Sequence, residues 1–220
     1  MKCFLFTLII VLLYSCSSVT NVPESQLRSD YYESRKPGTR YSRVYVDVKE
    51  DSLVIIPVDK NKTALTPTKE VENQILVKKS FDVDVLTVPF KFRPSTYNFP
   101  RQLTVDFNGS LFLGYRFDRY KVLFNQTPVG VVKKLRHRAL TMGVFGGVGT
   151  TSVNPWTTNY RTTDEYNGFI FNRGISLMAG VNNLTVGAGI GWDYLTDRDK
   201  EIWIYQNKPW FGLTLSLNLN

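Results

Sequence analysis

The chain has 220 residues, 27 Lys and Arg against 19 Asp and Glu, and a formal net charge of +8 at pH 7. This length allows one large domain or two small ones, and it is sufficient for an all-β barrel that folds as a single unit. The only cysteines, Cys3 and Cys16, lie near the start of the chain, and His137 is the one histidine. This composition excludes a disulfide framework and a Cys/His metal centre, so we expect no metal and no cofactor.

The first residues form an export signal. Lys2 precedes an apolar run over residues 4–13, and Leu13-Tyr14-Ser15-Cys16 follows it. The run is too short for a permanent membrane-spanning helix, and its flanks are typical of a secretory signal. The sequence resembles a type II signal peptide with its lipobox, which implies a lipoprotein signal peptide over residues 1–15 and lipidation of Cys16. The alternative is a plain secretory signal that is cleaved near Ser15 to Ser18.

Residues 16–42 are polar and show no apolar period, which predicts a lipidated flexible tether. A β-hairpin and a polar connection are expected over residues 43–80. Val44, Val46 and Val48 alternate with other residues along its first strand, and Ser52 to Val58 forms its second.

From residue 81 to residue 220 the pattern changes to long alternating strands, in which apolar residues occupy every second position. They exceed the usual five or six residues and match the roughly nine to eleven of a strand that crosses an outer membrane. The expected strands are Phe81–Phe92, Leu103–Phe117, Leu140–Thr150, Phe171–Val181, Leu184–Tyr194 and Phe211–Leu219. We therefore predict an all-β fold: a small antiparallel up-and-down β-barrel over residues 81–220, with the Val44–Val58 hairpin raising it to about eight strands.

Alternation alone leaves open which face points outward. A soluble, lipocalin-like barrel would enclose an apolar ligand, whereas a membrane barrel would present its apolar face to lipid. The other face carries mainly Gly, Thr, Ser and Asn, such as Thr104, Asp106 and Asn108 in the Leu103–Phe117 strand. Together with aromatic residues near the strand ends, this composition favours a narrow polar lumen and an outer-membrane location.

Asn182-Asn183 predicts a tight turn, because Asn tolerates positive φ. Short turns of outer-membrane barrels lie on the periplasmic side, so the connections near residues 93–102, 151–168 and 196–208 are expected to be external. The second of these contains isolated aromatic residues, and external loops usually carry recognition. The candidate surface recognition residues are Trp156, Tyr160 and Tyr166.

A basic run lies at the entrance of one expected strand. Because an exported chain rarely meets nucleic acid, its cationic side chains are expected to contact anionic lipid or lipopolysaccharide. The residues of this run are Lys133, Lys134, Arg136 and Arg138. His137 lies among them and could serve as the base of a lipid-modifying enzyme. No fixed spacing to a serine or an acid supports that role, so no catalytic residue is expected.

Three stretches of the expected barrel carry distinctive motifs: Phe99-Pro100-Arg101-Gln102-Leu103, Asn182-Asn183-Leu184-Thr185-Val186-Gly187 and Ile202-Trp203-Ile204-Tyr205. These stretches resemble a group of uncharacterised lipoproteins and small barrels from Bacteroidetes, over roughly Phe81 to Asn220. The resembling motifs carry no assigned chemistry. From the whole sequence we predict a lipid-anchored outer-membrane β-barrel lipoprotein with a structural or binding role at the cell envelope and no catalysis. Outer-membrane lipid, lipopolysaccharide and an envelope protein would be its partners. The alternatives are a periplasm-facing lipoprotein whose soluble β-barrel binds an apolar ligand, and the enzyme based on His137.

Overall fold

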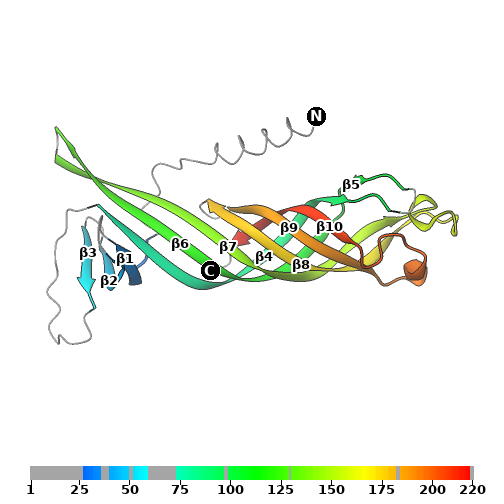
Figure 1. Ribbon diagram of the computed structural model, residues 1–220, viewed down its shortest axis with the longest axis horizontal. Helices are drawn as coiled ribbons and strands as arrows, with labels where there is room; N and C mark the ends of the chain where they lie inside the picture. The colour runs from blue at the N-terminus through cyan, green and yellow to red at the C-terminus, as the bar shows by residue number, and fades with distance from the viewer. Residues whose placement is uncertain are drawn as a thin grey trace. The chain divides into compact units, whose positions relative to one another are not determined.

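The computed structural model describes residues 27–35, 40–49, 52–58, 73–96, 99–128, 130–181 and 184–218 (Figure 1). This part of the chain is an all-β protein built on an antiparallel sheet, as predicted, with two short 3-10 helices. No helix within it is long and apolar enough to cross a membrane. The chain divides into two compact units. Unit 1 contains residues 1–78 and 119–137, and unit 2 contains residues 79–118 and 138–220.

The strands β4, β6 and β7 contribute residues to both units, whereas β1 to β3 belong to unit 1 and the remaining strands to unit 2. The strands are β1 (Asp30–Arg35), β2 (Ser42–Lys49), β3 (Ser52–Pro57), β4 (Gln74–Arg93), β5 (Gln102–Thr104), β6 (Asn108–Thr127), β7 (Gly130–Val153), β8 (Tyr166–Val181), β9 (Leu184–Leu195) and β10 (Pro209–Asn218). The 3-10 helices are η2 (Trp156–Thr158) and η3 (Arg198–Glu201).

Unit 2 contains a closed ring of six strands. Its strand order is β10-β9-β8-β7-β6-β4, and β10 pairs back onto β4 in antiparallel register, with Phe211 opposite Phe92 and Leu217 opposite Val85. Strands β8 and β9 pair up to Val181 and Leu184, as a tight turn between them requires. The turn residues themselves lie outside the described part of the chain.

The expected contribution of the Val44–Val58 hairpin to this ring is not observed. β2 and β3 do form a hairpin, with Val44 opposite Pro57 and Lys49 opposite Ser52, but β2 pairs with β1 on its other side. The ring closes without the hairpin because β10 meets β4 directly.

A β-bulge in β4 determines which of its residues face the interior of the ring. Leu213 lies opposite Phe90 but Leu215 lies opposite Thr87, so β4 contains one more residue than β10 over this stretch. The extra length includes Pro89, which has no N–H group to donate and is tolerated in a strand at such a bulge. Beyond the bulge the alternation is shifted by one residue, which turns Lys91 and Arg93 into the ring.

The expected strand Leu103–Phe117 is interrupted at residues 105–107. The short β5 pairs with β4, and β6 begins at Asn108. The Asn108 side chain replaces part of the backbone pairing there: its Oδ1 accepts from Val88 N at 2.7 Å, and its Nδ2 donates to Val88 O at 2.8 Å. A polar residue that the alternation places on the lumen face therefore anchors the start of the long strand.

The flexible tether expected over residues 16–42 is not observed at residues 30–35, because these residues form strand β1 of unit 1. β1 pairs with β2 on one side and with β4 on the other. Only Tyr32 and Ser34 are buried along β1, and Ser34 Oγ donates to Gln74 Oε1 at 2.9 Å. Tyr32 is the one large apolar residue that is buried along β1, so the sequence of this strand shows no alternation of apolar and polar residues. Backbone pairing with β2 and β4 and the Ser34–Gln74 hydrogen bond hold the strand in place. The core of unit 1 contains Leu27, Tyr32, Val44, Val46, Ile55, Leu76, Tyr120, Val122 and Leu135.

Candidate functional site

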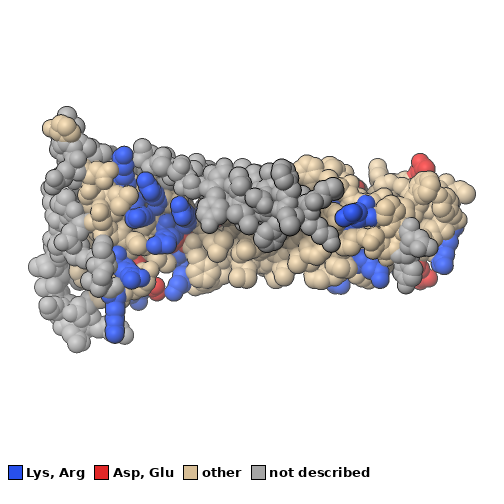
Figure 2. All heavy atoms as spheres, turned by 45° about the horizontal axis from the view of Figure 1, so that its top comes forward, with Lys and Arg blue, Asp and Glu red and all other residues tan. Residues whose placement is uncertain are grey.

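The outer surface of the ring is apolar. Every second residue of each ring strand points away from the interior, and most of these side chains are large, apolar and exposed. Figure 2 shows, on one face of the molecule, an extended tan region that carries no Lys, Arg, Asp or Glu side chains. We call these residues the apolar belt: Phe81, Val85, Phe90, Phe92, Leu111, Leu113, Tyr115, Phe117, Leu140, Met142, Val144, Val148, Phe169, Phe171, Ile175, Leu177, Val186, Tyr194, Phe211, Leu213 and Leu217.

Arg173 is an exposed charged residue on the same face of β8. Its neighbours across the sheet are Gly146 on β7 and Trp192 on β9. A guanidinium on a long flexible stem beside an indole and a glycine can extend along the surface toward water.

The interior of the ring combines an apolar plug with buried charges. The plug consists of fully or almost fully buried side chains from five of the ring strands: Leu86, Val88, Phe112, Phe145, Met178 and Trp210. On β9, the buried carboxylate of Asp193 accepts hydrogen bonds from Lys91, Arg93 and Trp210. The interior is therefore filled by side chains.

A second group of interior charges is dominated by carboxylates. Arg116 Nε donates to Asp118 Oδ1 at 3.1 Å, and its NH1 lies 3.8 Å from Asp82 Oδ2. Ser216 Oγ donates to Asp84 Oδ2 at 2.6 Å. Asp82 and Asp84 are both buried and both take part in structural contacts. Within the described part of the chain, no group of three or more His, Cys, Asp or Glu residues could hold a metal ion.

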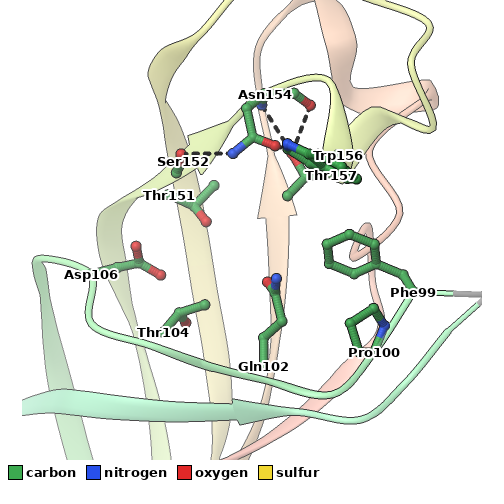
Figure 3. Close-up of a pocket in the computed structure, with 10 residues that line it drawn as sticks. All are labelled: Phe99, Pro100, Gln102, Thr104, Asp106, Thr151, Ser152, Asn154, Trp156 and Thr157. Atoms are coloured by element: carbon green, nitrogen blue, oxygen red, sulfur yellow. Dashed lines mark hydrogen bonds between the residues drawn. The ribbon is translucent and has the colours of Figure 1, made fainter.

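Unit 2 also contains an open cavity of about 440 Å³ between the segment around β5 and the end of β7 (Figure 3). Its walls carry hydroxyl, amide and carboxylate groups together with two aromatic rings. In Figure 3, Asp106 and Thr104 lie on one side, Phe99 and Pro100 on the other, and the Gln102 amide points in between them. The lining residues are Phe99, Pro100, Gln102, Thr104, Asp106, Thr151, Ser152, Asn154, Trp156 and Thr157.

Two polar atoms in the cavity wall are buried without a hydrogen-bond partner in the structure, namely Thr104 Oγ1 and Asp106 Oδ2. A buried polar atom without a partner costs about 1–3 kcal/mol, so proteins rarely keep one unless something else satisfies it. Gln102 is partly engaged, because its Oε1 accepts from the Tyr205 hydroxyl at 3.2 Å. That contact assigns the Gln102 amide nitrogen as a donor available to the cavity.

The loop that carries Trp156 is held in one conformation by its own hydrogen bonds. Thr157 N donates to Asn154 Oδ1 and Asn154 N donates to Thr157 Oγ1, each at 3.0 Å. The next loop joins it, because Ile204 N donates to Thr157 O at 3.0 Å. A buried cluster lies beneath both loops, made of Val153, Ile170, Leu195, Trp203, Ile204 and Tyr205. The cavity wall is therefore built before any ligand arrives.

The structure brings together two of the three aromatic residues that the sequence singled out. The rings of Trp156 and Tyr160 meet edge to face at 5.1 Å, and both side chains are largely exposed. Tyr166 is different, because it is half-buried at the start of β8 and its hydroxyl donates to Asp199 Oδ2 at 2.9 Å. Burial and that hydrogen bond raise the pKa of Tyr166 to about 12. Its role here is to hold the loop after β9.

The basic run lies along β7. Lys134 and Arg136 are exposed side chains of unit 1, and Arg138 is an exposed side chain of unit 2. His137 is half-buried in unit 1, and its ring stacks on Tyr120 at 4.3 Å with an interplanar angle of 10°. The side chain of Lys133 and the whole of Cys16 lie outside the described residues.

Sequence reasoning missed the polar wall of the cavity. Thr104 and Asp106 belong to a segment where a continuous strand was expected, so the alternation assigned them to a lumen face. Gln102 lies at the end of the expected connection over residues 93–102. The sequence did indicate one half of the site, because the loop around Trp156 is long and polar and contains isolated aromatic residues. The other half comes from residues about fifty positions earlier. Comparison with known proteins finds no matching family model, no matching curated protein and no matching solved structure.

Proposed function

We propose that this protein is an integral outer-membrane β-barrel lipoprotein, anchored through Cys16, that acts as a binding element at the cell envelope without catalysis. The observation that carries the proposal is the apolar belt on the outside of the ring, combined with buried charges inside it. Soluble monomers rarely expose contiguous apolar patches of more than a few hundred Å². A closed ring with apolar residues outside and polar residues inside is the arrangement that a lipid bilayer stabilises.

The interior supports a binding role over transport. The apolar plug and the Asp193 cluster occupy the interior of the ring, and small barrels have lumens that are filled by side chains. The outward direction of the apolar belt argues against a soluble barrel that encloses an apolar ligand, because such a barrel needs its apolar face inside. Recognition is then assigned to the loops, which a rigid scaffold positions.

Extraction tests the membrane part of the proposal. The protein should stay in the membrane fraction after alkaline carbonate treatment, and unheated samples should migrate differently from boiled ones on a gel. A form in which a plain secretory signal replaces residues 1–16 is exported without lipid. Release of this form by carbonate would contradict an integral barrel, because the ring alone should retain it.

Cysteine labelling tests the face of the strands. Ala188 is an exposed residue of β9 on the belt side, and Thr163 is an exposed loop residue. In intact membranes, a water-soluble maleimide should label Thr163→Cys but not Ala188→Cys, because lipid covers position 188. Equal labelling of both positions would show that the belt faces water.

Protease treatment of intact cells tests the orientation. Arg161 is exposed in the loop between η2 and β8 and should be cut by trypsin without permeabilisation. Cleavage that requires a permeabilised outer membrane would place this loop in the periplasm and reverse the proposed orientation.

A further inference from the structure

We propose that the cavity of unit 2 binds a neutral saccharide, with Asp106 and Thr104 as hydrogen-bond partners of sugar hydroxyls and Trp156 as a stacking surface. The inference deepens the proposed function, since it names the ligand class, and it depends on that function only for placing the cavity outside the cell.

The size and construction of the cavity suit a small ligand. Its volume of about 440 Å³ lies within the range of roughly 300–1,000 Å³ that is usual for small-molecule sites. The Asn154–Thr157 hydrogen bonds and the contact of Ile204 N with Thr157 O hold one wall in place. A preformed site loses little conformational entropy when a ligand binds.

The polar chemistry of the wall matches hydroxyl groups, which both donate and accept. Asp106 Oδ2 can only accept when ionised, Thr104 Oγ1 can do either, and the Gln102 amide nitrogen donates. The first two atoms are buried without partners, so a ligand that supplies hydroxyls at these positions removes an existing cost. An apolar ligand would leave both atoms unsatisfied.

The aromatic groups provide the complementary apolar contact. Phe99 and Trp156 line the cavity, and the exposed fraction of the Trp156 side chain is 58%. A sugar ring presents C–H groups on its faces and hydroxyls at its edge, so a flat ring beside hydrogen-bonding groups contacts both parts of it. Tyr160 contacts the Trp156 ring edge to face and supports its orientation.

The charge of the wall excludes acidic ligands. Among the lining residues that the structure describes, Asp106 is the only charged side chain, and none is Lys or Arg. Phosphate and carboxylate groups are normally bound by Arg, Lys or backbone N–H groups, and a carboxylate in the wall repels them. A neutral sugar is therefore favoured over a phosphorylated or acidic one.

The test uses the full-length protein in detergent micelles on a printed array of neutral and acidic oligosaccharides. We expect binding to a subset of the neutral members. Affinity for the strongest of them is then measured by isothermal titration for Asp106→Asn, Thr104→Val and Trp156→Ala. Each should weaken binding by about tenfold or more, which corresponds to roughly 1.4 kcal/mol. Glu165→Gln and Thr163→Val are matched controls, because they make the same changes at exposed positions that do not line the cavity, and they should bind as the wild type does.

Thr104→Val guards against misinterpretation through unfolding, because it removes a hydroxyl without a partner and should keep the protein folded. Absence of binding to every neutral oligosaccharide, binding to acidic members alone, or unchanged affinity in the three cavity variants would overturn the inference. Carbonate extraction remains a separate readout. A protein that is retained in membranes but binds no sugar loses only this inference, and one that binds sugar but is released loses only the membrane proposal.

Discussion

Lys91 Nζ lies 3.1 Å from each carboxylate oxygen of Asp193 inside the six-stranded ring. The same carboxylate accepts from Arg93 NH2 at 2.5 Å and from Trp210 Nε1 at 2.9 Å. The Lys91 ammonium also lies 4.9 Å from the centre of a Trp210 ring. The Asp193 carboxylate thus neutralises part of the charge of two buried cations, and it also accepts a hydrogen bond from the Trp210 indole.

Replacing Asp193 should strongly destabilise the ring. Asp193→Asn removes the carboxylate that forms ion pairs with both Lys91 and Arg93, and breaking a buried pair by removing one partner costs about 3–5 kcal/mol. The free energy of unfolding in a urea titration of the micelle-folded protein measures this. Lys91→Met should cost less, because it leaves Arg93 and Asp193 as a balanced pair. Similar losses for the two variants would show that charge balance is not what stabilises the cluster.

Neighbouring glycines on β7 should differ in their tolerance of alanine. A Cβ at Gly147 would lie 2.1 Å from Gly109 O and 2.4 Å from Ser110 Cα, both backbone atoms of the adjacent strand. At Gly146 the nearest atom would be Asn172 O at 4.0 Å. Overpacking costs typically about 1–3 kcal/mol or more, so Gly147→Ala should reduce the heat-modifiable folded fraction while Gly146→Ala should not. Loss of folding in Gly146→Ala alone would mean that the two faces are assigned the wrong way round.

Alkaline pH should loosen the loop that Tyr166 holds. Tyr166 lies on the loop side of the belt residues of β8, and burial together with its hydrogen bond to Asp199 raises its pKa from 10.0 to about 12. The folded state therefore holds this proton more tightly than the unfolded chain. The resulting stabilisation is complete below pH 10.0 and is lost as the pH rises toward about 12.

An ultraviolet titration of tyrosinate should show this late ionisation. In Tyr166→Phe the late component should decrease by one tyrosine, and Tyr205, whose pKa is also raised by burial, should still contribute to it. The variant should also lose less stability between these two pH values than the wild type does. An equal loss in both proteins would remove Tyr166 from the explanation.

Lipid attachment at Cys16 predicts that Cys16→Ala abolishes labelling by an alkyne fatty acid and blocks maturation of the precursor. The reason is that the thiol is the acceptor of the lipid and that cleavage of a lipoprotein signal follows lipidation. Labelling should be unchanged in Cys3→Ala, which alters the other cysteine of the chain. Full labelling of Cys16→Ala would place the lipid at another residue, and absence of labelling in the wild type would favour the plain secretory signal.

The existence of the ring strands could be predicted from the sequence, because alternation is a local property. The expected strand Leu184–Tyr194 corresponds to β9, Leu184–Leu195, almost residue for residue. The ends were harder to predict: β4 begins at Gln74, and β7 extends from Gly130 to Val153. Hydrogen bonding to neighbouring strands carries these elements beyond the part of the sequence that alternates.

The candidate site was predictable only in part. Trp156 was identifiable as an isolated aromatic residue in a long polar connection. Thr104 and Asp106 were not, because the break at residues 105–107 depends on the Asn108 side chain pairing with Val88 on another strand. No local pattern reports such a contact.

The sequence by itself determined that unit 2 consists of strands with one apolar and one polar face, since a period of two sorts side chains in this way whatever surrounds them. Only the tertiary structure decided which face is outside. Pairing of Phe211 with Phe92 closes the ring, and the bulge at Pro89 turns Lys91 and Arg93 inward toward Asp193. These pairings join residues that are a hundred or more positions apart, where the local pattern of either segment carries no information about its partner. Closure of the ring therefore determines which face of each strand points inward, and the apolar side chains of the opposite face lie on the outer surface.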